Sequence, residues 1–255
     1  PLIDQSSAAW IFAAFECALI HFDSREFFSR SRLIQPTNEY FSGNVNNVHE
    51  KASTIYKHTV KYAGLAHWPF ELRAPEQYQY QPSPQLEILV GHSDVSVPRD
   101  SSDNLPSLVS ESPLFITYNP QQTLKPEDLS SSFAHVIAQY LVIQSQLFPP
   151  GGTDYFAEGT EVLVIMMGFG VMFANSAYTF RGGCGSCCNG QSNRQATLSE
   201  NEVVFTLALY CKLKQIPVSE ATSHLKKHLK SEMQKANILI GFLHYSYKNT
   251  EIQQH

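Results

Sequence analysis

The sequence predicts an α+β fold, a mostly helical single domain in which a small β-sheet precedes a buried helix. Apolar and amphipathic stretches suited to helices occupy both ends of the chain, whereas short apolar runs separated by Pro, Ser and Asp lie between about 70 and 120. No change of composition is sharp enough to mark a domain boundary. We therefore expect one domain over residues 1–255, with N-terminal helices at 1–66, a small sheet and loops at 67–122, and a helical core at 123–255.

The first half of the chain is expected to supply two helices and two strands. The helices span 5–22 and 44–65, and the second is opened by asparagine caps and stopped near Gly64. The sequence LIQPTNEYF between them is interrupted by Pro and Asn and fits neither the helical nor the strand periodicity of apolar residues. It should therefore form an ordered loop. The best strands are QLEILVG and PLFITYN, and the polar stretch between them, 96–113, is expected to be a loop.

The second half is expected to be helical. Pro126 suits the first position of a helix, and the two acidic residues after it suit the positive end of the helix dipole. This helix is apolar on nearly all sides and should be buried. The next helix is also apolar, and its Gly168 and Gly170 permit the close approach of a neighbour. The expected helices that follow the one at Pro126 span 158–180, 199–214 and 218 to about 245.

Charge and composition exclude several classes of protein. A formal net charge of −5 and a pI near 6.1 leave no dense basic face, so no nucleic-acid partner is expected. The longest uncharged apolar run, 162–174, is shorter than the roughly 20 residues that cross a bilayer. The first 22 residues lack the basic start of a signal peptide. We expect a cytoplasmic protein without a membrane partner.

Three of the five cysteines are crowded into the sequence CGSCCNG. An odd number at this spacing differs from a secreted disulfide framework, so reduced thiols are expected. Cys184, Cys187 and Cys188 offer three thiolates where a closed zinc site uses four ligands, and no second C-x-x-C follows. A loop with incidental thiols is the preferred interpretation, and a redox or metal role is the alternative.

The helix that begins at Pro126 carries a histidine in a frame known from zinc peptidases. In H-E-x-x-H, two histidines one turn apart bind one metal, and the glutamate beside the first is the general base. Here the frame reads His135, Val136 and Gln139. Valine cannot take a proton from water, and a neutral amide oxygen is a poor zinc ligand compared with imidazole. By these residues alone, His135 is an ordinary buried histidine.

Three blocks carry a wider similarity: PLFITYNPQQTLKPEDLSSSFAHVIAQYLV, PPGGTDYFAEGTEVLVIMMGFGVMFANSAYTF and LSENEVVFTLALYCKLKQI. Together with LIQPTNEYF and YAGLAHWPFEL, they resemble an uncharacterised bacterial family of zincin-like proteins, in which this looks like a member with a degenerate motif. In that family the helix reads A-H-E-L-A-H, and a later helix begins T-D before an apolar run that ends G-F-G-x-F-x-A-N-S-A. The resemblance covers most of the chain and implies a zincin-like fold.

The resemblance places His135 at the first zinc-ligand position, Val136 at the catalytic base, Gln139 at the second ligand and Glu161 at the acidic third ligand. Because the base and the second ligand are replaced, we expect no hydrolysis and no cofactor, with a weakly held zinc as the alternative.

Glu161 stands at the head of an apolar helix, and a carboxylate that is buried unpaired costs several kcal/mol, roughly. It should therefore have a partner. We expect His135, Gln139 and Glu161 still to converge, with a histidine–carboxylate hydrogen bond in the space of the metal. In the alternative, Glu161 points to solvent from the first helical turn.

A second histidine pair, His224 and His228 in HLKKH, has the i, i+4 spacing of two ligands on one helix face. It lies in a lysine-rich helix of the kind that forms a solvated surface, so no biological metal site is expected there. The sequence contains no phosphate-binding loop, dinucleotide fingerprint or G-x-S-x-G motif.

The preferred function is that of a catalytically inactive zincin-like metallopeptidase homologue that acts as a protein- or peptide-binding, regulatory module. In zincins an extended peptide can add to the edge strand above the active-site helix. The resemblance therefore marks Phe115, Thr117 and Tyr118 of PLFITYN as binding residues on an edge strand.

Two other functions stay open. A metal-dependent hydrolase with an altered site would use His135, Glu161 and a third ligand such as His92 or Asp94 of GHSDVS. A structural subunit of an assembly would have the cleft beside His135 filled by side chains. The oligomeric state does not follow from the sequence.

Overall fold

The computed structural model describes residues 2–22, 24–43, 47–79, 87–89, 107–109, 113–181 and 197–252. Helices dominate this part of the chain, and a small parallel sheet accompanies them, which confirms the predicted mostly helical α+β layout. The α-helices are α1 (Gln5–His21), α2 (Ser24–Ser29), α3 (Val48–Tyr62), α4 (Pro126–Ser145), α5 (Phe156–Val164), α6 (Gly170–Arg181), α7 (Glu200–Leu213), α8 (Val218–Ser223) and α9 (Lys227–Ile252). Short helical turns are η1 (Pro75–Gln77), η2 (Pro120–Leu124), η3 (Gly152–Tyr155) and the π-helical η4 (Ile165–Phe169).

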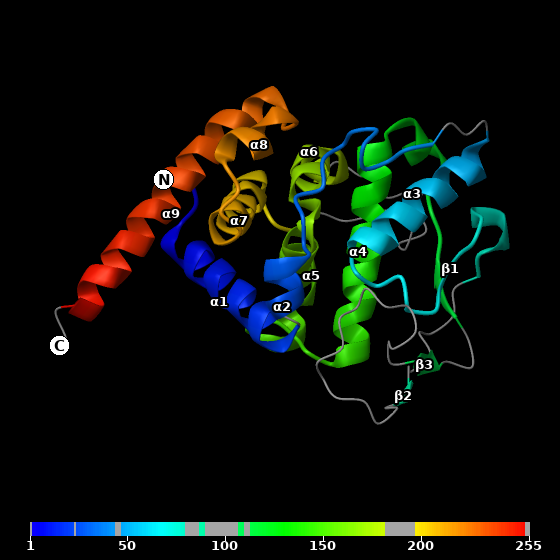
Figure 1. Cartoon of the computed structure of the whole chain (residues 1–255), viewed down its shortest axis with the longest axis horizontal. Coiled ribbons are helices and arrows are strands. Elements are labelled where there is room, and N and C mark those ends of the chain that lie inside the picture. The colour runs from blue at the N-terminus through cyan, green and yellow to red at the C-terminus, as the bar shows by residue number, and fades with distance from the viewer. Residues whose placement is uncertain are drawn as a thin grey trace.

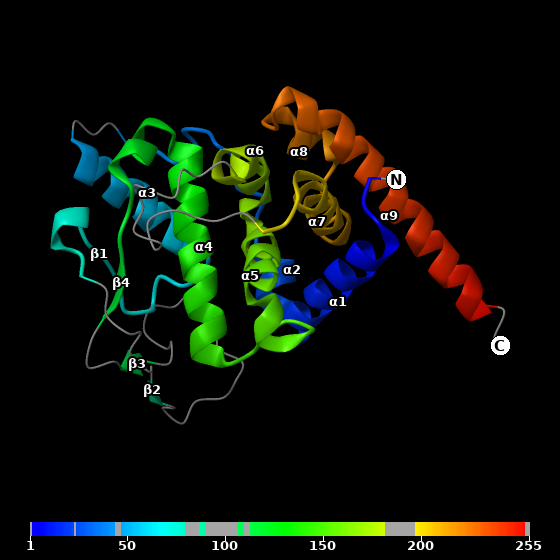
Figure 2. The same ribbon diagram turned by 180° about the vertical axis from the view of Figure 1, so that it is seen from behind.

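The helices are arranged around the upright α4, which is buried along most of its length. On one side of α4 lie α3 and the strands β1 and β4, and on the other side lie α5 and α6 (Figures 1 and 2). Beyond α5 and α6 come α7 and α1, and α9 forms the outer edge. Two clusters of buried side chains fill the space, one among α1, α5, α6, α7 and α9, the other between α3, α4 and β4.

The described strands are short. β1 (Phe70–Leu72) pairs in parallel with β4 (Leu114–Ile116), and Glu71 stands opposite Phe115. β2 (Glu87–Leu89) pairs with β3 (Ser107–Val109) in antiparallel orientation. β2 and β4 lie within the two predicted strands, whereas β3 lies in the stretch predicted as a loop, so that prediction is wrong there. Three-residue strands carry too few residues to reveal a period of two in the sequence.

The predicted helix starts are confirmed where capping residues marked them. Asn47 caps α3 through a bond from the backbone N–H of Glu50, and Ser199 caps α7 through a bond from that of Glu202. Pro126 occupies the first turn of α4. The short helix α2 was not predicted.

The apolar helix predicted over 158–180 is broken in the middle, at the π-helical turn η4. Gly168 there has a φ of 102°, in the left-handed region that glycine tolerates. The backbone N–H of Ile34 donates to the carbonyl of Gly168 (2.9 Å), and the Ser31 hydroxyl donates to that of Met166 (3.1 Å). The loop around residues 31–34 thus donates hydrogen bonds to two carbonyl groups at the break in the helix.

Both predicted close approaches are confirmed. A Cβ added at Gly168 would meet the carbonyl oxygen of Arg32, and one added at Gly170 would lie 2.7 Å from Cδ1 of Leu207 in α7. The two glycines therefore let a loop and a helix pack directly on the broken helix.

The stretch Gly152–Ala177 is long and apolar enough to cross a membrane by length and composition, but 78% of its most apolar window is buried inside the protein. The core helix of a globular fold has this pattern too.

Candidate functional site

His135 is buried in α4, with 6% of its surface exposed, and its ring faces α5 and α6. Its Nε2 lies 3.3 Å from the hydroxyl oxygen of Thr160. That hydroxyl also donates to the carbonyl of Ala157 (2.8 Å). Which atom donates between Thr160 and His135 depends on the tautomer of the imidazole. In the tautomer with a proton on Nε2, this nitrogen donates to the hydroxyl and cannot at the same time bind a metal.

The break in the helix brings two separate turns to His135. Its ring contacts Phe173 of α6, with ring centroids 6.2 Å apart, as well as the hydroxyl of Thr160 in α5. In a straight helix these two residues would be about 20 Å apart along the axis. The turn at η4 thus folds the two halves of the helix around the imidazole.

Glu161 is completely buried, so the alternative in which it points to solvent is wrong. One carboxylate oxygen accepts the backbone N–H of Thr197 (3.0 Å), and the other accepts that of Leu198 (2.8 Å). The prediction that this buried carboxylate has a partner is confirmed. These donors lie just before α7, where the positive end of the helix dipole favours a negative charge.

Thr160 and Glu161 are neighbours on α5, and successive side chains on a helix point about 100° apart. Thr160 faces His135, while Glu161 is turned toward the start of α7. A direct hydrogen bond between His135 and Glu161 stays a prediction. Gln139 is half-buried one turn after His135, and Val136 packs against the cluster between α3, α4 and β4.

These residues fit zinc poorly as a ligand set. Nε2 of His135 is engaged by the Thr160 hydroxyl, both oxygens of Glu161 accept backbone amides, and Gln139 offers a neutral amide. Among the residues that the structure describes, no group of three or more His, Cys, Asp and Glu could hold a metal ion.

The predicted binding residues on the edge strand are largely engaged inside the protein. The Phe115 carbonyl, which points away from β1, accepts the Tyr140 hydroxyl of α4 (2.9 Å). The Thr117 hydroxyl donates to the carbonyl of Arg73, and the buried Tyr118 hydroxyl lies 3.1 Å from Nδ1 of His49. A peptide that added to this edge would compete with Tyr140 for the same acceptor.

The prediction that His224 and His228 share one helical face is wrong. The chain leaves α8 at His224 and enters α9 at Lys227, because Asn175 of α6 holds the connection. Its side-chain amide donates to the carbonyl of His224 (2.8 Å) and accepts the backbone N–H of Lys226 (2.9 Å). The same amide donates to Glu127 of α4 (2.9 Å).

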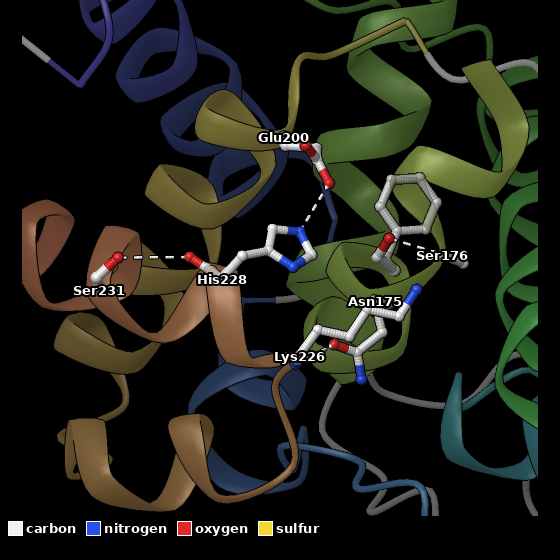
Figure 3. Close-up of polar contacts among 7 residues, drawn as sticks. Asn175, Ser176, Glu200, Lys226, His228 and Ser231 are labelled. Atoms are coloured by element: carbon white, nitrogen blue, oxygen red, sulfur yellow. Dashed lines mark hydrogen bonds and ion pairs between the residues drawn. The ribbon is translucent and has the colours of Figure 1, made fainter. Parts of the chain in front are cut away.

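The His228 ring lies 3.3 Å from a carboxylate oxygen of Glu200 at the start of α7 (Figure 3). Figure 3 also draws the bond from the backbone N–H of Lys226, two residues before His228, to the side-chain oxygen of Asn175. The two contacts tie the start of α9 to α7 and to α6.

The first turn of α7 adds a further carboxylate to this region. Burial opposes ionisation of Glu202, but hydrogen bonds from Ser199 and from the Ser7 hydroxyl outweigh it and hold the pKa of this carboxyl below its ordinary value of 4.5. A lowered pKa in the folded state means that the stabilisation is present above pH 4.5 and is lost as the pH falls further.

We therefore expect Glu202→Gln to lower the free energy of unfolding by about 0.5–1 kcal/mol at neutral pH, because the capping box loses its charge. The difference between the two proteins should vanish near pH 3. Urea titrations at both pH values measure it, and an equal difference at both would contradict the assignment.

Several predicted candidates fall outside the described residues, namely His92, Asp94, Cys184, Cys187 and Cys188. The other two cysteines have free thiols, and burial raises the pKa of Cys17 and raises that of Cys211 to about 12. Thiols with raised pKa values are poor nucleophiles at neutral pH.

Sequence reasoning missed Thr160 and the amides of Thr197 and Leu198. The serine and glutamate spacing of LSENE marks a helix start with free N–H groups, so it could have suggested an anion partner there. Nothing in the sequence singles out Thr160.

Comparisons with models of protein families, with curated proteins and with solved structures give no match.

Proposed function

We propose that the chain is a catalytically inactive zincin-like metallopeptidase homologue that acts by binding a protein or peptide. The observation that carries the proposal is that Nε2 of His135 and the carboxylate of Glu161 have hydrogen-bond partners within the protein. Nε2 of His135 lies 3.3 Å from the Thr160 hydroxyl, and both carboxylate oxygens of Glu161 accept backbone amides. With Val136 at the position of the base, this frame has no group to activate water. Such a protein can still act by binding a partner on its surface.

Zinc analysis of protein purified without a histidine tag tests the inactive half of the proposal. We expect less than about 0.1 zinc per chain and no cleavage of peptide substrates, since structural and catalytic zinc sites both use three or more strong protein ligands. The double variant Val136→Glu, Gln139→His restores H-E-x-x-H and should take up zinc if the frame is that of a former site.

Zinc bound stoichiometrically to the wild type and lost on His135→Ala would overturn the inactive assignment. A double variant that folds and takes up no zinc would count against a zincin-like origin. The binding half requires affinity purification from the source cells and reconstitution with the purified partner. That partner should bind the wild type and His135→Ala equally, because binding does not use the imidazole.

A further inference from the structure

Two buried side-chain oxygens in the loop that follows α2 have no hydrogen-bond partner among the described residues. They are Oε1 of Gln35, a residue with only 6% of its surface exposed, and Oγ1 of Thr37. A buried polar atom that stays unpaired loses its solvation without replacement. Roughly nine in ten such atoms in proteins are bonded to protein or to ordered water. The two oxygens therefore indicate that a bound molecule is held beside them.

The side-chain amide of Gln35 is fixed in one orientation. Its Nε2 donates to the backbone carbonyl of Glu220 in α8 (3.1 Å), and a carbonyl can only accept. Turning the amide over would set Oε1 against that carbonyl, as two acceptors with no proton between them. Oε1 therefore points away from Glu220 and needs a donor of its own.

Thr37 is held close to Gln35 by a tight turn around Pro36. The backbone N–H of Thr37 donates to the carbonyl of Gln35 (2.8 Å), and the carbonyl of Thr37 accepts the N–H groups of Tyr40 (3.1 Å) and Phe41 (3.0 Å). The Thr37 hydroxyl forms no direct bond with Oε1 of Gln35, although it could donate to it. Two polar atoms that lie on one turn and do not bond each other are suited to a single small bridging molecule.

The chemistry of the two oxygens selects the bridging molecule. An amide oxygen only accepts, so the molecule must donate to Oε1, which excludes an anion, whereas the hydroxyl can donate or accept. A hard metal cation takes about six or more oxygen ligands. Among the described residues, no group of three or more His, Cys, Asp and Glu could hold such an ion. A small neutral donor remains, and water is the smallest.

We propose that one water molecule is bound between Oε1 of Gln35 and Oγ1 of Thr37 as a permanent part of the fold. The water donates one proton to Oε1 and forms a second hydrogen bond with the Thr37 hydroxyl. Gln35 also bonds α8, and its neighbour Ile34 donates to the carbonyl of Gly168 (2.9 Å). The bound water therefore completes the attachment of this loop to α8 and to the break in the apolar helix.

A high-resolution crystal structure tests the site directly. One water should lie about 2.5–3.0 Å from each of the two oxygens. In solution, magnetic relaxation dispersion of oxygen-17 water counts the long-lived internal waters. The Thr37→Val protein should hold one fewer than the wild type or exchange it faster.

The stability of Thr37→Val changes in opposite directions with and without the bound water. The substitution keeps the branched shape of the side chain and removes its hydroxyl. With the water in place, a hydrogen bond is lost and the equilibrium constant for unfolding should rise about fivefold. Without it, the substitution removes an unpaired buried hydroxyl and should lower that constant. Thr37→Ser is the control, because it keeps the hydroxyl and should keep the water. A Thr37→Val protein more stable than the wild type, or a crystal structure in which no water contacts both oxygens, would overturn the proposal.

Discussion

Replacing Glu161 by alanine is expected to lower the free energy of unfolding by about 3–5 kcal/mol. The substitution removes two charge-assisted hydrogen bonds, those from the backbone N–H groups of Thr197 and Leu198. Hydrogen bonds to charged groups contribute about 1.5–3 kcal/mol each. The start of α7 should loosen as a result.

Chemical denaturation followed by circular dichroism measures this effect, and amide hydrogen exchange at Leu198 reports the local loosening. Glu161→Gln should cost less than Glu161→Ala, because its amide oxygen can still accept one of the two N–H groups. The control is Glu16→Ala on the exposed face of α1, which should change stability by no more than about 0.5 kcal/mol. A loss below about 1 kcal/mol for Glu161→Ala would contradict a capping role for this carboxylate.

Replacing Gly168 by alanine is expected to lower the free energy of unfolding by about 3 kcal/mol or more. A left-handed backbone costs a residue with a Cβ about 1–2 kcal/mol, and forcing an extra carbon into a packed core costs about 1–3 kcal/mol. The new Cβ would collide with the carbonyl oxygen of Arg32, which is backbone and cannot turn away as a side chain could. The loop at 31–34 would have to move off the broken helix.

The matched control is Gly241→Ala, because Gly241 lies in α9 with nothing within 4 Å of its added Cβ. This substitution should raise stability by about 0.5–1 kcal/mol, since alanine favours a helix over glycine. Both variants are compared by urea denaturation. If Gly168→Ala lost no more than Gly241→Ala gained, the close approach of Arg32 would not matter for stability.

The helix boundaries that could be predicted were those marked by local chemistry. Pro126 with its acidic neighbours, Asn47 and Ser199 act within their own first turn, so the sequence alone reveals them. The break at Gly168 could not be predicted, because the apolar pattern is the same on both sides of it. Its cause is contact with the loop at 31–34, more than 130 residues earlier in the chain.

The candidate site divides in the same way. A carboxylate in an apolar run must be bonded, so the need of Glu161 for a partner followed from its neighbours in the sequence. Which groups satisfy it depends on how α5 packs against the start of α7. The sequence LSENE marks a helix start there, but it does not show that Glu161 is the side chain that reaches it. The role of Asn175 could not be predicted for the same reason, because its side chain bonds backbone groups at His224 and Lys226, between the end of α8 and the start of α9.

The hydrogen bonds from Asn175 to the connection between α8 and α9 restrict how α9 can move relative to the rest of the protein. Its amide joins the backbone at His224 and Lys226 to Glu127 in the first turn of α4, and Leu225 between them is buried. The connection between α8 and α9 is therefore tied by hydrogen bonds to both α6 and α4, the helix that holds His135. A displacement of α9 would have to break these bonds or move α6 and α4 with it.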